Sequence, residues 1–358
     1  MANRIDKLLK LMTAENQNFP MLVEKSRNIV YLTGYTGEGW LLVTASGSTI
    51  ITDFRYTEQA AKQAPGVNVI MYDASHPMLE ILRELLNNCG ARKLALEEDA
   101  ITVSRYRTML TKLSGIELTN SNRLIEKLRA VKDEEELASI KKANEIASAA
   151  FVKLLDVLKP GMTEKEVQLE LNYMMERMGG QAVAFNTIAC AGANGSLPHA
   201  IPGDHKLQNG ELLTLDFGTV YNNYCSDTTR TVAIGKISPE LKQIYDTVLE
   251  AQKIALDLVK PGMCCFDIDK AARDFIDGHA QYKGTFGHGL GHGVGLDIHE
   301  APSFNTRDKT ILVPGHVMTV EPGIYIPGFG GCRIEDMGAI TEDGFDNYVT
   351  APKELITI

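Results

Sequence analysis

Two aspartates on neighbouring predicted strands, Asp216 and Asp227, are the first residues whose spacing suggests chemistry. The segments LLTLDFG and YCSDTTRTVAI both read as strands, and a turn centred between Tyr221 and Asn222 would join them as a hairpin. In that register the two aspartates are directly opposed, with Cβ atoms about 4.5–5.5 Å apart. Opposed carboxylates repel each other, so the spacing predicts a bound cation or a raised pKa. The alternative is that both point into water at a hairpin edge.

A glycine-rich run, GHGLGHGVGLDIHE, holds three of the eight histidines: His288, His292 and His299. Glycine lets the backbone approach a ligand or a neighbouring strand closely, and neutral imidazole is a common metal ligand and proton-transfer group. The run has neither the HExxH pattern nor the Lys-Ser/Thr pair of a phosphate-binding loop. It therefore predicts a metal-binding or proton-transfer segment, against the alternative of structural histidines.

Two further carboxylates, Glu321 in VMTVEPGIY and Glu335 in GGCRIEDMG, interrupt apolar predicted strands. A buried glutamate needs a partner or a metal ion. Arg333 lies two residues before Glu335 and has the same facing on a strand, where it would neutralise that carboxylate or hold a substrate group. The alternative for either glutamate is a salt-bridged structural acid.

The four acids, Asp216, Asp227, Glu321 and Glu335, carry about four negative charges, which two divalent cations would balance. Carboxylates completed by one or more histidines suit Mn²⁺, Co²⁺ or Zn²⁺ better than soft Cu(I). Two such ions about 3.5–4 Å apart generate a bridging hydroxide and polarise a carbonyl. The set of residues thus points to metal-dependent hydrolysis.

The segments that hold these acids lie in an internal repeat. Residues 157–162 (VLKPGM) recur as residues 258–263 (LVKPGM), and each Pro-Gly pair separates two amphipathic helical patterns. LQNGELLTLDFGTVY, from Leu207, aligns with LVPGHVMTVEPGIYI, from Leu312, which pairs Asp216 with Glu321. Two halves related by a pseudo-twofold axis would make these acids a natural cation site, unless the match arises by chance.

Ahead of the repeat, residues 1–125 alternate helix and strand patterns and predict a small α/β domain with a mixed sheet. We expect strands at 21–24, 29–33, 41–54 with a turn at 45–48, 68–72 and 93–96, and helices at 4–14, 57–63, 77–88 and 103–113. No catalytic spacing occurs there, so a structural, assembly or lid role is expected. The charged segment RAVKDEEE predicts a linker at 126–132, followed by a catalytic domain at 133–358.

The composition is that of a folded globular protein of about two domains: 358 residues, 44% hydrophobic and 23% charged. The net charge of -10 disfavours a nucleic-acid or anionic-membrane surface, and no run approaches the roughly 18 apolar residues of a membrane span. The first residues lack the apolar core of a signal peptide, and the six cysteines have no CxxC spacing. We therefore expect a cytoplasmic protein with reduced cysteines that acts on small molecules or peptides.

With these motifs the chain resembles the pita-bread metallopeptidases, and within them the branch of Xaa-Pro aminopeptidases and Xaa-Pro dipeptidases, or prolidases. NIVYLTGYTGEGWLLVT and TDFRY resemble that branch's front domain, and everything after Lys132 resembles its catalytic domain. The implied fold is α+β, with a small N-terminal creatinase-like α/β domain and a C-terminal pita-bread domain with a pseudo-twofold repeat. The ordered set Asp, Asp eleven residues on, His, Glu, Glu is highly specific to this family.

The resemblance implies five metal ligands. They are Asp216 in TLDFG, Asp227 in CSDTTRT, His292 in GLGHGVG, Glu321 in TVEPG and Glu335 in RIED. These residues would hold two divalent metal ions, for which we expect Mn²⁺, with Co²⁺ and Zn²⁺ as alternatives.

The resemblance also implies the roles of the residues around the ions. His199 in SLPHA and His299 in LDIHE match histidines that stabilise the tetrahedral intermediate or pass protons. His288, Arg333 and Phe185 match positions that shape the proline pocket, and position 185 is Tyr in some aminopeptidase relatives. The implied mechanism is attack of a metal-bridging hydroxide on the carbonyl preceding proline, with Glu321 as the general base and the metals and His299 holding the oxyanion.

The implied function is an exopeptidase, in a homodimer, for peptides with proline at the second position. Some prolidases have an arginine where this chain has Ser303, which favours an aminopeptidase, although Arg307 or Arg333 would also serve the proline carboxylate of a dipeptide. The alternatives are a creatinase-like amidinohydrolase, a non-catalytic binding protein on the same fold and a methionine aminopeptidase. The five intact ligands argue against the first two, and the front domain argues against the third.

Overall fold

The computed structural model describes residues 2–358 and the side chains from Arg4 onward. The chain divides into two compact units, of which the first ends at Arg129 and the second runs from Ala130 to Ile358. Helix α6 (Leu124–Ala130) covers most of the stretch in which the sequence analysis expects a linker.

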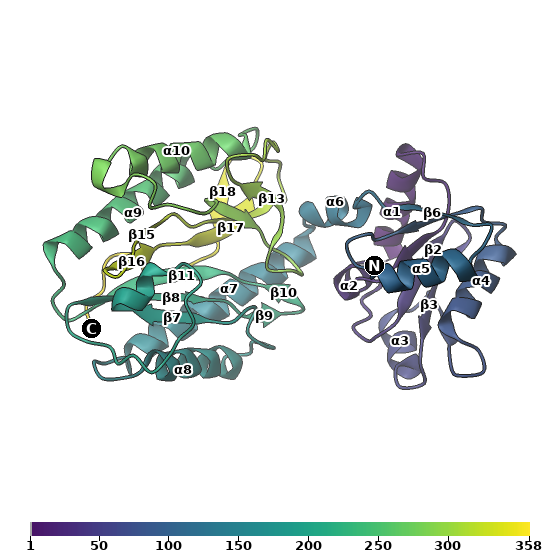
Figure 1. Ribbon diagram of the computed structural model, residues 1–358, viewed down its shortest axis with the longest axis horizontal. Helices are drawn as coiled ribbons and strands as arrows, with labels where there is room; N and C mark the ends of the chain where they lie inside the picture. Colours follow the sequence, from purple (N-terminus) through teal and green to yellow (C-terminus); the bar gives the residue numbers. More distant parts are fainter. Residues whose placement is uncertain (1) are drawn as a thin grey trace. The chain divides into compact units, whose positions relative to one another are not determined.

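The first unit, drawn in Figure 1, is built on a mixed six-stranded sheet. The order of its strands is β4-β3-β2-β1-β5-β6. Strands β1–β2 and β2–β3 are antiparallel, and the other neighbours are parallel. Leu82 and Leu86 of α4 and Met109 of α5 pack on the sheet and form its core with buried strand residues. The elements are α1 (Ala2–Ala14), β1 (Met21–Val23), α2 (Ser26–Thr33), β2 (Trp40–Thr44), β3 (Gly47–Thr52), α3 (Thr57–Gln63), β4 (Asn68–Met71), α4 (Met78–Asn88), β5 (Lys93–Leu96), α5 (Val103–Lys112) and β6 (Glu117–Asn120).

The predicted mixed α/β character of this unit is confirmed, but one predicted strand is wrong. Residues 29–33 (IVYLT), expected as a strand, belong to helix α2. This helix buries Ile29, Tyr31 and Leu32, and the Glu97 carboxylate accepts hydrogen bonds from the backbone N–H groups of Glu24 and Lys25 just before its start. Because Glu97 is distant in sequence, a local pattern of β-branched residues cannot reveal its stabilising effect on the helix. Strand β6 was not expected.

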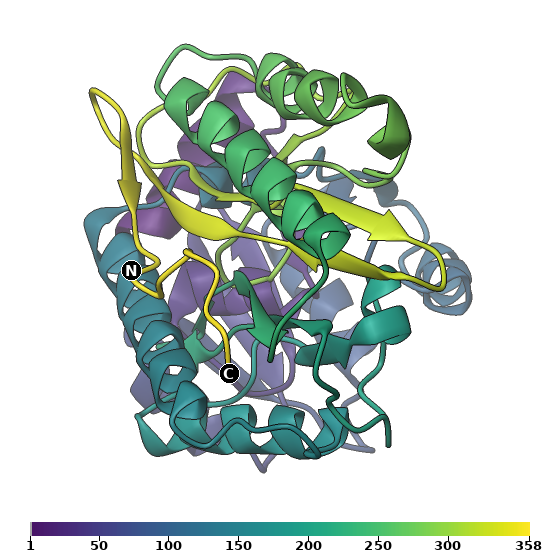
Figure 2. The same cartoon turned by 90° about the vertical axis from the view of Figure 1, so that its left-hand side faces the viewer.

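The second unit places its strands between helices α9 and α10 on one side and α7 and α8 on the other (Figures 1 and 2). Its main sheets have the orders β11-β8-β7 and β13-β12-β14-β17-β18. The elements are α7 (Glu134–Leu155), α8 (Glu164–Arg177), β7 (Ile188–Ala191), the 3₁₀ helix η1 (Gly192–Ser196), β8 (Glu211–Phe217), β9 (Val220–Tyr221), β10 (Tyr224–Cys225), β11 (Thr228–Ile234), α9 (Pro239–Leu258), α10 (Cys265–Asp277), the 3₁₀ helix η2 (Ala280–Tyr282), β12 (Gly291–Gly293), β13 (Glu300–Phe304), β14 (Val317–Val320), β15 (Gly323–Ile326), β16 (Gly330–Arg333), β17 (Asp336–Ile340) and β18 (Phe345–Asn347).

The internal repeat is present in the backbone hydrogen bonds of this unit. Gly161 N–H donates to the Leu207 carbonyl at 2.9 Å, and Gly262 N–H donates to the Leu312 carbonyl at the same distance. Both glycines have a left-handed φ, of 89° and 84°, which a residue with a side chain rarely adopts. The predicted pseudo-twofold repeat is therefore confirmed: each half is a helix pair followed by an antiparallel strand pair, β8–β11 or β14–β17.

The predicted register of the first strand pair is wrong by two residues. Asp216 pairs with Thr229, not with Asp227, because the turn is centred on Asn222 and Asn223. Both asparagines have a positive φ, 49° and 70°, as a two-residue hairpin turn of type I′ requires. A shift of two residues keeps side chains on the same face of a sheet. The two aspartates therefore share a face, but diagonally.

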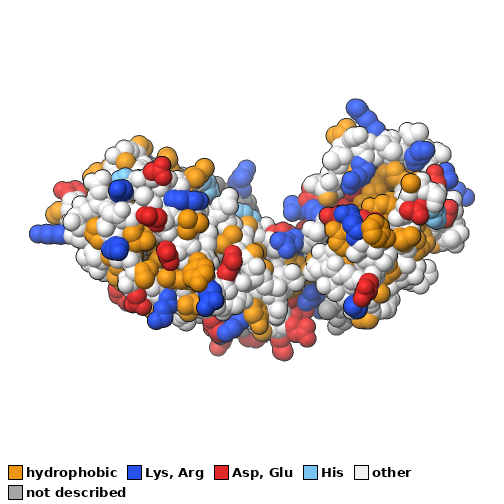
Figure 3. Space-filling view, turned by 90° about the horizontal axis from the view of Figure 1, so that it is seen from below, with side chains coloured by type: hydrophobic (Ala, Val, Ile, Leu, Met, Phe, Trp, Pro, Cys, Tyr) orange, Lys and Arg blue, Asp and Glu red, His pale blue; other side chains and the backbone are white. Residues whose placement is uncertain are grey.

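The surface charges, the helices and the cysteines add three observations. Acidic and basic side chains are interspersed on the face that Figure 3 shows. None of the helices in residues 2–358 has the length and apolar character needed to cross a membrane. The six cysteines are free thiols, and four of them are buried.

Candidate active site and metal centre

One cavity of about 960 Å³ in the second unit brings together every residue that the sequence analysis assigned to the site. The proposed metal ligands lining it are Asp216, Asp227, His292, Glu321 and Glu335. The other predicted site residues lining it are Phe185, His199, His288, His299 and Arg333. Residues up to 150 positions apart in sequence, from Phe185 to Glu335, thus meet in one cavity.

The four acids occupy equivalent places at the ends of the two strand pairs. Asp216 lies near the end of β8 and Asp227 directly precedes β11. In the second half, Glu321 directly follows β14 and Glu335 directly precedes β17. The pseudo-twofold repeat therefore aims two carboxylates from each half at the same cavity.

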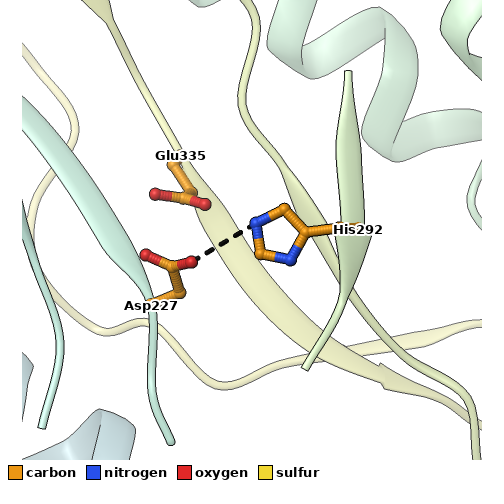
Figure 4. Close-up of side chains that lie close together, drawn as sticks. All are labelled: Asp227, His292 and Glu335. Atoms are coloured by element: carbon orange, nitrogen blue, oxygen red, sulfur yellow. Dashed lines mark ion pairs between the residues drawn. The ribbon is translucent and has the colours of Figure 1, made fainter. Parts of the chain in front are cut away.

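Three of the candidate ligands converge closely (Figure 4). Ligand atoms of Asp227, His292 and Glu335 all lie within 4.8 Å of one another. His292 Nε2 is 3.5 Å from Asp227 Oδ2 and 3.3 Å from Glu321 Oε1. His292 Nδ1 is 3.0 Å from the Gly293 carbonyl, and since a carbonyl only accepts, Nδ1 carries a proton. Nε2 is thus the nitrogen that faces the acids.

Burial and mutual repulsion make this group of acids unstable without a counter-charge. Desolvation raises the pKa of Asp216, and it raises the pKa values of Asp227 and Glu335 well above their ordinary range, with the neighbouring carboxylates adding to the effect. Burial also disfavours ionised Glu321, but the hydrogen bond and charge of His292, with His288 and Arg333, lower its pKa to about 2. All four carboxylates can therefore be ionised at the same time only when cations bind among them.

The donor set fits divalent metal ions. Asp216 Oδ1 is buried and, within residues 2–358, has no hydrogen-bond partner. Native structures rarely leave such an atom without a partner. Four carboxylates with an imidazole form a set of oxygen and nitrogen donors suited to divalent ions of the Mn²⁺, Co²⁺ and Zn²⁺ type.

Arg333 donates hydrogen bonds both to an acid of the candidate metal site and to residues beside it. Its guanidinium donates to Asp216 Oδ2 at 2.6 Å, not to Glu335 as one option of the sequence analysis had it. It also donates to the Tyr325 hydroxyl at 2.7 Å. His288 Nδ1 lies 2.8 Å from the Gly289 carbonyl, so its Nε2, 3.0 Å from the Tyr325 oxygen, is free to accept the hydroxyl proton. Burial lowers the pKa of His288, which favours this neutral form.

Two residues of this network, Tyr325 and Thr229, were missed by the sequence analysis. Thr229 donates to Glu335 Oε2 at 2.8 Å and accepts from Arg333 Nε at 3.1 Å. Its position two residues after Asp227 gives it the same facing, which was an available signal. Tyr325 shares a strand face with Gly323, the register partner of Arg333, but that register was not readable from the sequence.

The remaining histidines line the cavity beside the acids. The rings of His292 and His299 have centroids 4.4 Å apart at 69° to each other. Burial lowers the pKa of His299, and the neighbouring His292 charge lowers it further. His299 is therefore a neutral imidazole that can donate or accept a proton at the cavity surface.

Two family models match the chain, one in each unit. The model of metallopeptidase family M24 matches residues 138–342, and the Creatinase/Prolidase N-terminal domain matches residues 4–131. The Xaa-Pro dipeptidase of Pyrococcus furiosus is 35% identical over 359 residues, covering 99% of this chain and 100% of the relative.

Two solved structures extend the likeness to three dimensions. The Xaa-Pro dipeptidase from Bacillus anthracis has a TM-score of 0.95 at 38% identity and covers 99% of both chains. The X-Pro aminopeptidase from Thermotoga maritima has a TM-score of 0.90 at 34% identity and covers 99% of this chain and 100% of that one.

The chain belongs to metallopeptidase family M24 and carries the creatinase/prolidase N-terminal domain. It is therefore an enzyme of the metallopeptidase class, whose chemistry uses divalent metal ions. The predicted α+β architecture, with a creatinase-like front domain and a pita-bread domain, is confirmed.

Proposed function

We propose that the protein is an exopeptidase that hydrolyses the bond between an N-terminal residue and a following proline. The observation that carries the proposal is the convergence of four buried carboxylates and His292 in one cavity. Relatives of nearly the same length bear the names Xaa-Pro dipeptidase and X-Pro aminopeptidase. A creatinase-like amidinohydrolase or a non-catalytic protein is not favoured, because no ligand position is lost.

The five residues Asp216, Asp227, His292, Glu321 and Glu335 would hold two divalent ions, with Mn²⁺ preferred over Co²⁺ or Zn²⁺. When bound, such ions activate a water as the attacking hydroxide and polarise the scissile carbonyl. Their positive charge would also relieve the repulsion among the buried acids.

The chain's own residues would do the rest. Glu321, which accepts from the Thr319 hydroxyl at 3.2 Å, takes the proton of the attacking water. His299 and His199 donate to the oxyanion or pass a proton to the leaving proline nitrogen. His288, Arg333 and Phe185 shape a pocket for the proline ring, which brings no N–H donor to the site.

A second candidate is a strict dipeptidase, which needs a cation for the free carboxylate of proline. Of the arginines that line the cavity, Arg273 donates to Asp269 and Arg333 to Asp216. Arg307 also lines the cavity, and it has no side-chain hydrogen bond or ion pair within residues 2–358. Ser303 lines the cavity as well, so the wall there is uncharged at that position. We favour the aminopeptidase and treat Arg307 as the group on which a dipeptidase would depend.

The test is a cleavage panel of Xaa-Pro dipeptides, Xaa-Pro-Yaa tripeptides and matched Xaa-Ala peptides with added Mn²⁺, Co²⁺ or Zn²⁺. Cleavage only before proline, abolished by chelation, is expected. Comparable rates on tripeptides would exclude a strict dipeptidase.

Asp227→Asn and Glu335→Gln should each lower kcat by about a thousandfold or more, whereas Glu166→Gln, the same change on an exposed helix turn outside the cavity, should not. Full activity after chelation and in either site variant would refute the metal assignment.

We also propose a cytoplasmic homodimer in which residues 1–125 serve assembly or cover the site of the catalytic domain at 133–358. The first unit exposes Phe54, Val103 and Leu110, apolar side chains suited to a protein contact. Buried free thiols suit a reducing compartment.

A further inference from the structure

The cavity wall formed by residues 192–202 begins as the 3₁₀ helix η1 (Gly192–Ser196) and continues as irregular backbone that carries His199. Pro198, His199 and Ile201 all line the cavity, and Ile201 is 84% exposed. After the short 3₁₀ helix η1, this segment has no strand or helix of its own to hold it. Its position must therefore be fixed from outside.

A buried carboxylate, Glu164, fixes this segment at three points. Glu164 Oε1 accepts from the Ala191 backbone N–H at 2.7 Å, immediately before the segment. Glu164 Oε2 accepts from the Asn194 side-chain amide at 2.7 Å and from the Gly203 backbone N–H at 3.0 Å. One side chain thus ties both ends of the wall and a point between them.

The burial of Glu164 makes its hydrogen bonds to the wall necessary. Glu164 has no solvent exposure, and a buried carboxylate is tolerated only where hydrogen bonds replace its water. It is the first residue of helix α8, where the helix N-terminus favours a negative charge. Hydrogen bonds to an ionised acceptor are stronger than neutral ones. The wall therefore cannot shift without losing bonds that the buried charge requires.

In the second half of the repeat, different residues hold the segment that contains His288. On helix α10, Asp269 accepts from the Leu290 N–H at 3.0 Å, and Arg273 donates to the carbonyls of Phe286 and His288, each at 2.7 Å. The repeat places Cys265, not a carboxylate, at the position equivalent to Glu164. Each half therefore has its own helix-borne anchor. The segment with His199 is held by Glu164 of the first half and, at the Pro198 carbonyl, by a 3.3 Å hydrogen bond from Arg333 of the second.

We propose that Glu164 is a positioning residue for the hydrolytic reaction and that it acts through His199. By holding residues 192–202 against helix α8, it keeps the His199 imidazole where it can serve the developing oxyanion or the leaving group. This inference rests on the proposed function, which gives His199 its role. Groups that stabilise a transition state must be held within fractions of an ångström, so loosening the wall costs kcat.

The first test compares Glu164→Gln with Glu166→Gln. Glutamine keeps the shape of Glu164 but replaces one accepting oxygen with an amide that donates, so at least one wall donor loses its acceptor. Glu166, two residues on, only caps the helix through Thr163 and does not touch the wall. We expect E164Q to lower kcat at least tenfold, with KM and Mn²⁺ binding by calorimetry within about twofold of the wild type. E166Q should keep the wild-type kcat.

A double-mutant cycle with His199→Ala decides whether Glu164 acts through the histidine. If it does, E164Q should change kcat less than twofold in the H199A background, because its effect has already been removed. The proposal is overturned if E164Q lowers kcat by the same factor with and without His199, or if folded E164Q keeps the wild-type kcat. Should E164Q fail to fold by circular dichroism, Asn194→Ala, which removes a single donor, takes its place in the same cycle with the same two readings.

The failure of this inference is distinguishable from the failure of the proposed function. The wild-type rate on Xaa-Pro peptides tests the function alone. The cycle is measured on whichever peptide the wild type cleaves, so its coupling result holds for that peptide irrespective of the residue at its second position.

Discussion

Arg333 connects the buried acids, through the Tyr325 hydroxyl, to His288. Its planar guanidinium serves Asp216, the Tyr325 hydroxyl and the Thr229 hydroxyl at once. The Tyr325 hydroxyl in turn lies 3.0 Å from His288 Nε2. A lysine ammonium would keep the charge, but it is a compact donor without the rigid fork that reaches several acceptors. The geometry of Arg333, as well as its charge, should therefore matter.

Replacement of Arg333 by lysine should lower kcat/KM for Xaa-Pro peptides by about 10- to 100-fold, since charge-assisted bonds are lost while the net charge is kept. Tyr325→Phe, which removes only the hydroxyl, should cause a smaller loss. Steady-state kinetics on the same peptide measures both. A lysine variant as active as the wild type would mean that only the positive charge is needed.

The residues that carry charge were the readable part of the site. Asp216, Asp227, Glu321 and Glu335 stood out because an acid in an apolar strand needs a partner, and all four line the cavity. Tyr325 did not stand out, because a tyrosine in an apolar strand is unremarkable without the register of β15 and β16. Glu164 did not either, because its partners, from Ala191 to Gly203, lie in another part of the chain.

At the scale of elements, local sequence patterns predicted most helices and strands of the first unit. They failed where a residue distant in sequence contacts the start of an element. Helix α2 shows this, since IVYLT is rich in strand-forming residues and yet is helical beside the Glu97 carboxylate. The β8–β11 register failed for a local reason, the asparagine pair that adopts a left-handed turn. Such turns were predictable from turn chemistry, whereas the effect of Glu97 was not.

The turn that precedes β14 contains an acid-sensitive group, His316. It is 5% exposed, and its Nδ1 accepts from the Val313 N–H at 3.4 Å. Burial, with the charge of Lys132, lowers the pKa of His316 to about 4. Between pH 6.5 and 4 the unfolded chain therefore binds a proton that the folded chain resists, and stability falls as the pH falls.

His316→Gln should flatten this part of the stability curve. Glutamine can accept the Val313 hydrogen bond without titrating, so the variant should escape a loss of up to about 3 kcal/mol between pH 6.5 and 4, from roughly 1.4 kcal/mol per pKa unit. Urea unfolding of wild type and variant at several pH values in this window measures the difference. Parallel curves would show that His316 does not resist protonation in the folded protein.

At the scale of the whole molecule, the candidate metal centre joins the two halves of the repeat. Asp216 and Asp227 come from the first half, and His292, Glu321 and Glu335 from the second. Without cations these acids repel one another across the pseudo-twofold axis. Bound ions would therefore act as a cross-link within the second unit and as a source of stability, in addition to any role in hydrolysis.

Removal of metal should lower the melting temperature of the full-length protein. A ligand that binds only the folded state, at about 1,000 times its Kd, adds about 4 kcal/mol. For a unit of this size each kcal/mol moves the melting temperature by about 2–4 °C, so Mn²⁺ added to chelated protein should raise it by roughly 8–16 °C. Calorimetry with and without Mn²⁺ measures the shift. Asp227→Asn removes a ligand and one of the repelling charges, so the variant should lose most of the shift while its metal-free form melts no lower than the metal-free wild type. An equal Mn²⁺ shift in wild type and Asp227→Asn would place the stabilising ions elsewhere than in this cavity.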